Sequence, residues 1–158
     1  MFQIGDKVVH PMHGAGIVDS IVQEKVNGVM EDYYLLKLPN RSMVVMIPVK
    51  TSSEVGLRPV VPQGRADEVL SSIPTIQVEM ISNWNRRYRD NLERLKSGDL
   101  TEVARVIKGL TMRDRKRGLS TGERKMLNSA RDILISEVVM AKGMEEEEAA
   151  AALDAALA

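Results

Sequence analysis

The stretch Pro59-Val60-Val61-Pro62-Gln63-Gly64 divides the chain into two parts with different hydrophobic periodicities. Before it, apolar residues alternate with a period close to two, as they do in strands. After it, they recur every three to four residues, as they do in amphipathic helices. Two prolines and a glycine within six residues also interrupt regular structure. We therefore expect a β domain over residues 1–58 and a helical domain over residues 59–158, which is an α+β organisation.

The part before this stretch predicts several short strands joined by tight turns. Strands are expected over residues 7–10, 17–26, 30–38 and 43–49. Asn27-Gly28 favours the positive φ angles of a hairpin turn, and Pro39-Asn40-Arg41-Ser42 predicts the next turn. Pro48 fits a strand at a sheet edge or a strand end, because proline cannot donate to the ladder. Short strands with tight turns indicate a small, strongly bent sheet or barrel.

The part after the stretch predicts a compact all-α domain of about five helices. They are expected over residues 66–72, over 76–96, between Asp99 and Gly118, between Ser120 and Gly143, and over 144–158. Ser120-Thr121-Gly122-Glu123 has the pattern of a capping box, which favours a helix start. The last segment begins with four glutamates, which favour the positive end of a helix dipole. A frayed acidic tail is the alternative for that segment.

The composition excludes several classes of function. The chain has no cysteine, so disulfides, thiolate metal sites and cysteine nucleophiles are absent. No signal peptide or membrane span is evident, so we expect a cytoplasmic protein. Neither a nucleophile motif nor a phosphate-binding loop is present. His10 and His13 are the only histidines, and two imidazoles fall short of the three or four ligands of a zinc site. Asp6 and Asp19 could complete one, which makes a small metal-dependent enzyme a rival reading, but nothing in the spacing requires it. We therefore expect no enzyme activity, no metal and no cofactor.

A net charge of zero conceals an uneven distribution along the chain. Residues 86–131 contain fourteen Lys or Arg against six Asp or Glu, whereas residues 144–158 contain five acids and no base. Such asymmetry is typical of a segment that faces a polyanion and of an acidic tail. Arginine suits phosphate oxygens because its guanidinium donates two hydrogen bonds at once. A solvated helix face is the alternative reading of the same charges.

The basic segment begins at Asn83-Trp84-Asn85-Arg86-Arg87-Tyr88-Arg89, which places three guanidiniums beside two of the five aromatic residues. Two further basic groups follow, one at Arg113, Arg115, Lys116 and Arg117 and one at Arg124 and Lys125. They flank a tight turn and should lie close together. The spacing of Trp84 from its apolar neighbours favours packing in the core. Its alternative is an exposed wedge that stacks on a base or opens a minor groove.

Three ordered stretches resemble the CarD/CdnL family of bacterial RNA polymerase-binding regulators, and the resemblance covers nearly the whole chain. They are Ile4-Gly5-Asp6-Lys7-Val8-Val9-His10-Pro11-Met12-His13-Gly14, the stretch from Asn83-Trp84-Asn85-Arg86-Arg87-Tyr88 to Ser97-Gly98-Asp99, and Arg117-Gly118-Leu119-Ser120 followed by Gly122-Glu123-Arg124-Lys125-Met126-Leu127.

The resemblance implies a Tudor-like β domain that binds the β subunit of RNA polymerase, and a helical domain that contacts promoter DNA at the upstream edge of the melted region. It implies that Trp84 inserts into the minor groove and stabilises the open complex, which would overturn the core reading of that residue. Basic residues matching Arg86, Arg87, Arg89 and Arg124 would contact the DNA backbone, and Lys125 is counted with them. The protein would then act as a monomer, bound to polymerase on the nucleoid.

The resemblance also implies that polymerase is bound by strand pairing along Met43-Val44-Val45-Met46-Ile47-Pro48. Adding a strand to an exposed edge provides affinity through main-chain hydrogen bonds. Some relatives carry an arginine where this chain has Met46, so a charge contact there is in doubt. The alternative function is a protein–protein adaptor for polymerase without DNA contact, as in the corresponding module of a transcription-repair coupling factor.

Overall fold

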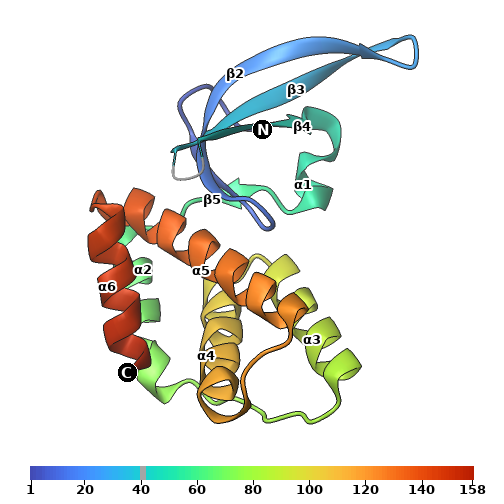
Figure 1. Ribbon diagram of the computed structural model, residues 1–158. Helices are drawn as coiled ribbons and strands as arrows, with labels where there is room; N and C mark the ends of the chain where they lie inside the picture. The colour runs from blue at the N-terminus through green and yellow to red at the C-terminus, as the bar shows by residue number, and fades with distance from the viewer. Residues whose placement is uncertain (40–41) are drawn as a thin grey trace.

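The computed structural model describes residues 1–39 and 42–158 and shows a sheet standing on a group of helices (Figure 1). The sheet is antiparallel with the order β4-β3-β2-β1-β5. Its strands are β1 (Lys7–His10), β2 (Gly14–Val26), β3 (Val29–Leu38), β4 (Met43–Pro48) and β5 (Arg58–Pro59). The expected strands are thus confirmed to within a few residues. The turn expected at 39–42 includes Asn40 and Arg41, which lie outside the described residues.

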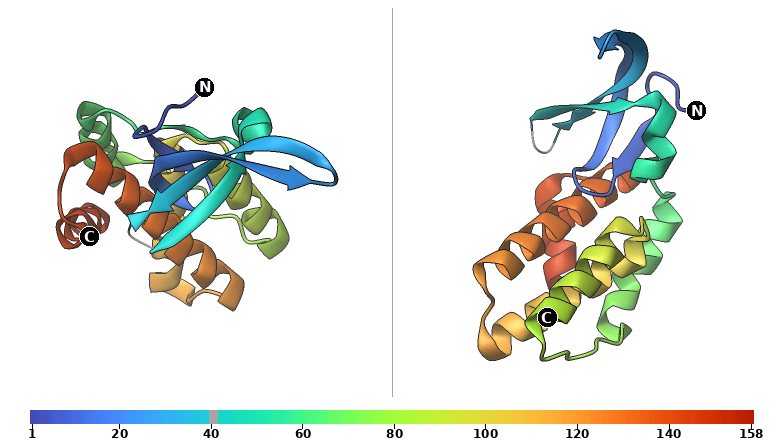
Figure 2. Two further views of the ribbon diagram at one scale, coloured as in Figure 1. Left: turned by 90° about the horizontal axis from the view of Figure 1, so that it is seen from above. Right: turned by 90° about the vertical axis from the view of Figure 1, so that its right-hand side faces the viewer.

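The long hairpin of β2 and β3 extends well beyond the rest of the sheet (Figures 1 and 2). Its turn has Asn27 at φ 51° and Gly28 at φ 81°, the two positive angles that a type I′ turn requires. An irregular pairing between Val18 and Ser20 bends β2. The core of the sheet lies at its base and consists of Val8, Val18, Tyr34, Leu36, Ile47 and Leu57.

Five α-helices follow the sheet, as the periodicity predicted. They are α2 (Gln63–Ser72), α3 (Trp84–Lys96), α4 (Leu100–Arg117), α5 (Thr121–Lys142) and α6 (Glu146–Leu157); the short α1 (Ser52–Val55) and the 3-10 turns η2 (Val49–Thr51) and η3 (Ile73–Thr75) complete the described helical elements. Their shared core contains the buried apolar faces of α4 and α5. The helix α5 runs beneath the sheet, and α3 and α6 lie on opposite sides of the helical group (Figure 1).

The helix expected over 76–96 begins only at Trp84, so its predicted start is wrong. Segment 76–83 is irregular instead, and basic side chains bind carbonyl groups in it and just before it. Lys108 Nζ donates to the carbonyls of Ile73, Pro74 and Ile76, and Arg105 donates to that of Gln77. The side chain of Asn83 then accepts from the backbone N–H of Arg86 and caps α3.

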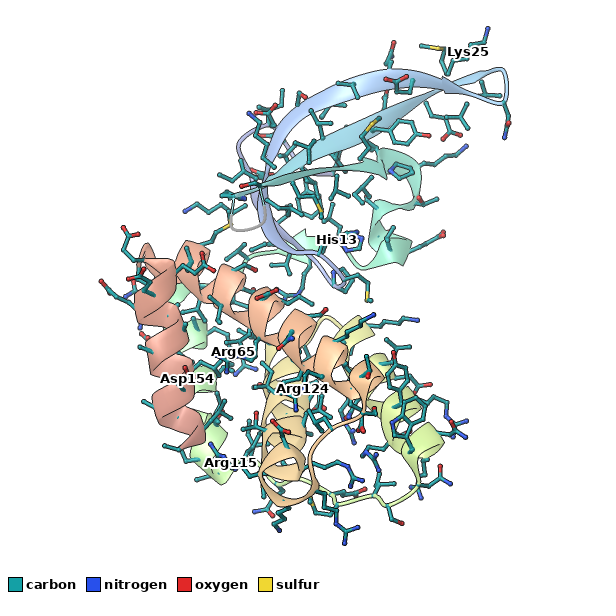
Figure 3. The ribbon with its side chains drawn as sticks, in the orientation of Figure 1. His13, Lys25, Arg65, Arg115, Arg124 and Asp154 are labelled. Atoms are coloured by element: carbon teal, nitrogen blue, oxygen red, sulfur yellow. The ribbon has the colours of Figure 1, made fainter. Side chains whose placement is uncertain are left out.

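The C-terminal acidic segment is a docked helix rather than a frayed tail. Ala149, Leu153 and Leu157 of α6 are buried against the helical core. Arg131 Nη1 lies 2.9 Å from Asp154 Oδ1, and Arg115 Nη1 donates to the Leu157 carbonyl at 2.9 Å. Figure 3 shows Asp154 on this helix and Arg115, which belongs to α4, near its C-terminal end. No helix within residues 1–39 and 42–158 is long and apolar enough to cross a membrane.

A small set of polar contacts joins the sheet to α5. Glu137 is fully buried, and its carboxylate accepts three hydrogen bonds. They come from Arg58 Nη1 at 2.7 Å, Arg58 Nη2 at 2.6 Å and the Val61 N–H at 2.9 Å. The Ala15 N–H donates to Ser136 Oγ at 2.9 Å. Gly14 has a φ of +95°, and a Cβ there would lie 2.7 Å from Ser136 Oγ. The turn between β1 and β2 therefore fits closely against α5 and fixes how the two domains face each other.

Candidate nucleic-acid interface and strand edge

Trp84 and Tyr88 form an aromatic platform at the start of α3. Their ring centroids are 4.9 Å apart and the ring planes differ by 14°, so the two rings stack. Trp84 is 41% exposed, whereas Tyr88 packs partly against the helical core. The core position that periodicity predicted for Trp84 is therefore wrong. A large apolar side chain is instead presented to solvent within the most basic part of the sequence.

Contacts from α5 hold this platform in place. Trp84 Nε1 donates to Ser120 Oγ at 3.0 Å. Arg87 donates from Nε to Glu123 Oε2 at 2.7 Å and from Nη2 to Glu123 Oε1 at 3.1 Å. The hydrogen bonds from Arg87 hold the pKa of the Glu123 carboxyl below its usual value and outweigh its burial, which acts in the opposite direction. A buried ion pair thus ties the first turns of α3 and α5 together.

Arg87 does not reach the surface as expected for a phosphate contact. It is 8% exposed, and its Nη1 also donates to the carbonyls of Ile81 and Ser82 at 2.9 and 3.1 Å. Its guanidinium is therefore occupied by Glu123 and by segment 76–83. We assign it the role of holding the platform rather than of contacting a ligand.

The other predicted basic residues are exposed. Arg86 Nε lies 3.7 Å from Asp90 Oδ2, a distance that leaves the guanidinium largely available. Arg124 is more firmly engaged, because its Nη2 donates to Asp114 Oδ1 at 2.7 Å. Arg89 and Lys125 are exposed and make no ion pair within the described part of the chain. The surface around the platform therefore offers both free and weakly paired cations.

Two helix N-termini lie side by side at this surface. The bond from Trp84 to Ser120 joins the first residue of α3 to the residue that caps α5. The N-terminal end of a helix carries a partial positive charge and unpaired N–H groups, both of which favour an anion such as phosphate. The predicted proximity of the basic groups on either side of the α4–α5 turn is confirmed by the Arg124–Asp114 pair. Arg115 instead turns toward α6, where it binds a carbonyl (Figure 3).

Among the described strands, β4 forms one edge of the sheet and has β3 as its one partner. Its register places Val44 opposite Lys37 and Met46 opposite Leu35, on the face turned away from the sheet core. Val44 is 54% exposed and Met46 is 42% exposed, whereas Ile47 on the other face is buried. Met43 is also exposed, Val45 and Pro48 are half-buried, and the outer edge of the strand is unpaired. This edge has the free main-chain groups and the apolar side chains that a partner strand could use.

His10 and His13 lie together at the base of the sheet, where His13 faces the helical domain (Figure 3). Their ring centroids are 4.5 Å apart. Burial, together with the nearby His13, lowers the pKa of His10 to about 4, and its Nδ1 accepts from the Met12 N–H at 3.0 Å. Within residues 1–39 and 42–158, no group of three or more potential metal ligands includes them.

Sequence reasoning missed the contacts that Ser120 and Glu123 make with α3. Their capping-box pattern was visible, and Ser120 Oγ does accept from the Glu123 N–H at 3.2 Å. The side chain of Glu123 binds Arg87 instead of completing the box. Partners 36 residues away in the sequence, Trp84 and Arg87, cannot be found from a local pattern.

Comparisons with known proteins agree with this two-part structure. A family model described as "CarD, C-terminal domain" matches residues 68–154, and one described as "CarD-like/TRCF RID domain" matches residues 2–61. A curated relative is YdeB of Bacillus subtilis (strain 168), described as a candidate transcription factor. It is 32% identical to this chain over 148 residues, which cover 94% of this chain and 97% of the relative.

Proposed function

The chain belongs to the CarD family, and on this basis we propose that it is a transcription regulator that binds RNA polymerase and promoter DNA and stabilises the open complex. Family membership makes it transcription factor-like. The finer role is the proposal: the β4 edge binds the polymerase β subunit, and the aromatic platform contacts DNA at the upstream edge of the melted region. The protein would act as a monomer in the bacterial cytoplasm, with polymerase on the nucleoid.

The exposed stack of Trp84 on Tyr88 is the observation that carries the DNA contact. Exposing a large apolar ring to water is unfavourable unless a partner covers it. Here the ring lies at the start of α3, bonded to the residue that caps α5, within the most basic part of the sequence. Apolar wedges flanked by basic residues are the means by which many proteins open a minor groove. Arg86, Arg89, Arg124 and Lys125 would contact phosphates. Such contacts position a protein without reading sequence, which suits a factor acting at many promoters.

The open edge of β4 supports the polymerase contact. A partner strand would pair with its main-chain groups, and the exposed Val44 and Met46 would add apolar contact. Met46 offers no charge at the position where some relatives carry arginine. We therefore propose that strand pairing and apolar burial, rather than an ion pair, supply the affinity.

The two contacts would act together as a tether and a wedge. Binding to polymerase raises the local concentration of the helical domain at the promoter. Trp84 then shifts the equilibrium between closed and open promoter complexes only to the extent that it binds melted DNA more tightly than closed DNA. The close fit of the β1–β2 turn against α5 holds the two contact surfaces at a fixed separation, so the tether would also orient the wedge.

Salt-dependent binding to a promoter fragment tests the DNA contact. We expect the binding constant to fall with salt at a log–log slope of about −0.9 per phosphate neutralised. Lys125→Ala should make that slope shallower by about one such unit. Lys25→Ala is the matched control, because Lys25 lies at the hairpin tip, far from the helical domain (Figure 3).

The adaptor alternative makes a different prediction for the same experiment. Of the five predicted cations, Arg87 and Arg124 bind acids at 2.7 Å and Arg86 lies 3.7 Å from one, so fewer positive charges are left for DNA, which favours the adaptor. An adaptor would bind polymerase but show no salt-dependent DNA binding, and Lys125→Ala would then behave like Lys25→Ala.

A further inference from the structure

The indole of Trp84 has one polar atom, and that atom is already bonded within the protein. Its Nε1–H donates to Ser120 Oγ at 3.0 Å. The same hydroxyl accepts from the Glu123 N–H at 3.2 Å and so caps α5. One side chain therefore fixes both the start of a helix and the orientation of the exposed aromatic ring.

The backbone next to Ser120 restricts the ring further. A Cβ on Gly122 would lie 3.6 Å from Trp84 Cζ2 and 3.7 Å from Tyr88 Cε2. The edge of the aromatic stack thus rests close to the first turn of α5. Tyr88 covers one face of the indole, and the hydrogen bond limits its rotation about the side-chain torsions. Together these contacts hold a ring that is nevertheless 41% exposed.

We infer that Ser120 is a positioning residue for Trp84, which it holds in the orientation that the partner meets; this inference rests on the proposed function of Trp84. A side chain held in one orientation before binding loses less conformational entropy when it binds. Ser120 thereby strengthens the wedge without touching DNA itself.

The same bond decides what kind of contact the ring can make. Every side-chain atom of tryptophan other than Nε1 is carbon, so the part left for a partner is apolar. The minor groove presents acceptors at A·T pairs, and the indole has no free N–H with which to read them. Trp84 would therefore act by apolar contact with stacked bases or sugars, without hydrogen-bond discrimination between base pairs.

Fluorescence tests the positioning directly, because Trp84 is the only tryptophan. Ser120→Gly removes the hydroxyl, and glycine is itself a tolerated helix cap, so the helix start is little affected. Ser120→Thr retains the hydroxyl. We expect Ser120→Gly to lower the fluorescence anisotropy of Trp84 and to increase its quenching by acrylamide. Ser120→Thr should keep both at their wild-type values. Unchanged anisotropy and quenching in Ser120→Gly would overturn the inference.

Open-complex lifetime tests the consequence, using the full chain and a bacterial RNA polymerase. Ser120→Gly should shorten the lifetime by about 2- to 10-fold, the range expected for one hydrogen bond, while Ser120→Thr stays near wild type. Trp84→Phe keeps a ring on Tyr88 but has no N–H to donate. In a Trp84→Phe background, Ser120→Gly should have no further effect. If Ser120→Gly shortens the lifetime as much in the Trp84→Phe background as in the wild type, Ser120 acts only by capping α5.

The two claims fail in different ways. If Trp84→Ala leaves the lifetime unchanged while fluorescence shows a loosened ring in Ser120→Gly, the proposed function fails and the positioning of the ring stands. If Trp84→Ala shortens the lifetime but Ser120→Gly alters neither fluorescence nor lifetime, the positioning role fails and the proposed function stands.

Discussion

His10 is the single residue whose environment most clearly links protonation to folding. The imidazole is 6% exposed, and its pKa falls from 6.5 to about 4 because burial and then the neighbouring His13 disfavour its charged form. A second proton would have to go on Nδ1, which already accepts from the Met12 N–H. The folded state therefore resists protonation that the unfolded state accepts between pH 6.5 and pH 4.

This residue predicts a loss of stability on mild acidification. Because the folded pKa is the lower one, the stabilisation is present above pH 6.5 and is lost as the pH falls toward 4. From these two values we expect the free energy of unfolding to drop by about 2 kcal/mol between pH 7.5 and pH 5. In His10→Asn, urea denaturation should show a clearly shallower pH dependence. An unchanged slope in that variant would contradict this assignment.

Single-residue roles were the hardest feature to predict from sequence. The residue types around Trp84 predict a polyanion contact, and this stays a prediction. Periodicity placed the ring in the core and the family resemblance counted Arg87 among the DNA-backbone contacts, whereas the ring is exposed and Arg87 is buried. The position of each side chain depends on a partner 36 residues away in the sequence. That partner is Ser120 for the Trp84 ring and Glu123 for the Arg87 guanidinium. Such pairs are formed by tertiary packing, and no spacing rule within one helix contains them.

At the scale of secondary-structure elements, β4 combines two features that a soluble sheet usually avoids. Its outer edge has no neighbouring strand, and its outward face carries Val44 and Met46. Lys37 lies across from Val44, and its Nζ is 3.4 Å from Asp19 Oδ1. An edge of this kind invites pairing with another strand, which is why we assign the polymerase contact to it.

A charge placed on this edge should weaken polymerase binding without unfolding the protein. Val44→Lys changes an exposed side chain, so stability should stay within about 0.5 kcal/mol of wild type. Affinity for polymerase should fall about tenfold or more, as for a central interface residue. Val26→Lys, at a position 44% exposed near the hairpin tip, is the control and should bind normally. Equal losses in both variants would argue against β4 as the contact.

Elements were largely predictable because their signals are local. The Asn27-Gly28 turn, the cap at Asp99 and the glycines after the helices each placed an element boundary. The helix expected from residue 76 was the exception. Its extra turns are replaced by an irregular segment whose carbonyls bind Lys108, Arg105 and Arg87. Apolar spacing was present there, but carbonyls of this segment accept from side chains of α3 and α4 instead of from helical N–H groups.

At the scale of the whole molecule, the joint between the sheet and α5 decides whether the chain behaves as one body. Its central contact is the fully buried Glu137, which Arg58 and the Val61 N–H bind from the other side. Removing one partner of a buried ion pair leaves an uncompensated charge, which costs far more than an exposed pair contributes. On the proposed function, this joint would set the position of the DNA contact relative to the polymerase contact.

Removing this contact should destabilise the molecule strongly. We expect Arg58→Ala to lower the free energy of unfolding by about 3–5 kcal/mol, measured by urea denaturation. Arg65→Ala is the control, because the contacts of Arg65 are exposed: ion pairs at 3.4 Å with Glu68 and 3.9 Å with Asp99, and a hydrogen bond to Thr101 Oγ1 at 2.8 Å. That variant should lose less than about 1 kcal/mol. Similar small losses in both would mean that the joint contributes little to stability.

The most direct test of the tether-and-wedge mechanism is the lifetime of promoter open complexes as a function of protein concentration. We predict that Trp84→Ala lowers the maximum lifetime even at saturating protein, because the wedge itself is missing. Val44→Lys should reach the wild-type maximum, but only at about tenfold higher concentration, because only the tether is weakened. A Trp84→Ala protein that reaches the wild-type maximum would contradict the central claim that this exposed ring stabilises melted DNA.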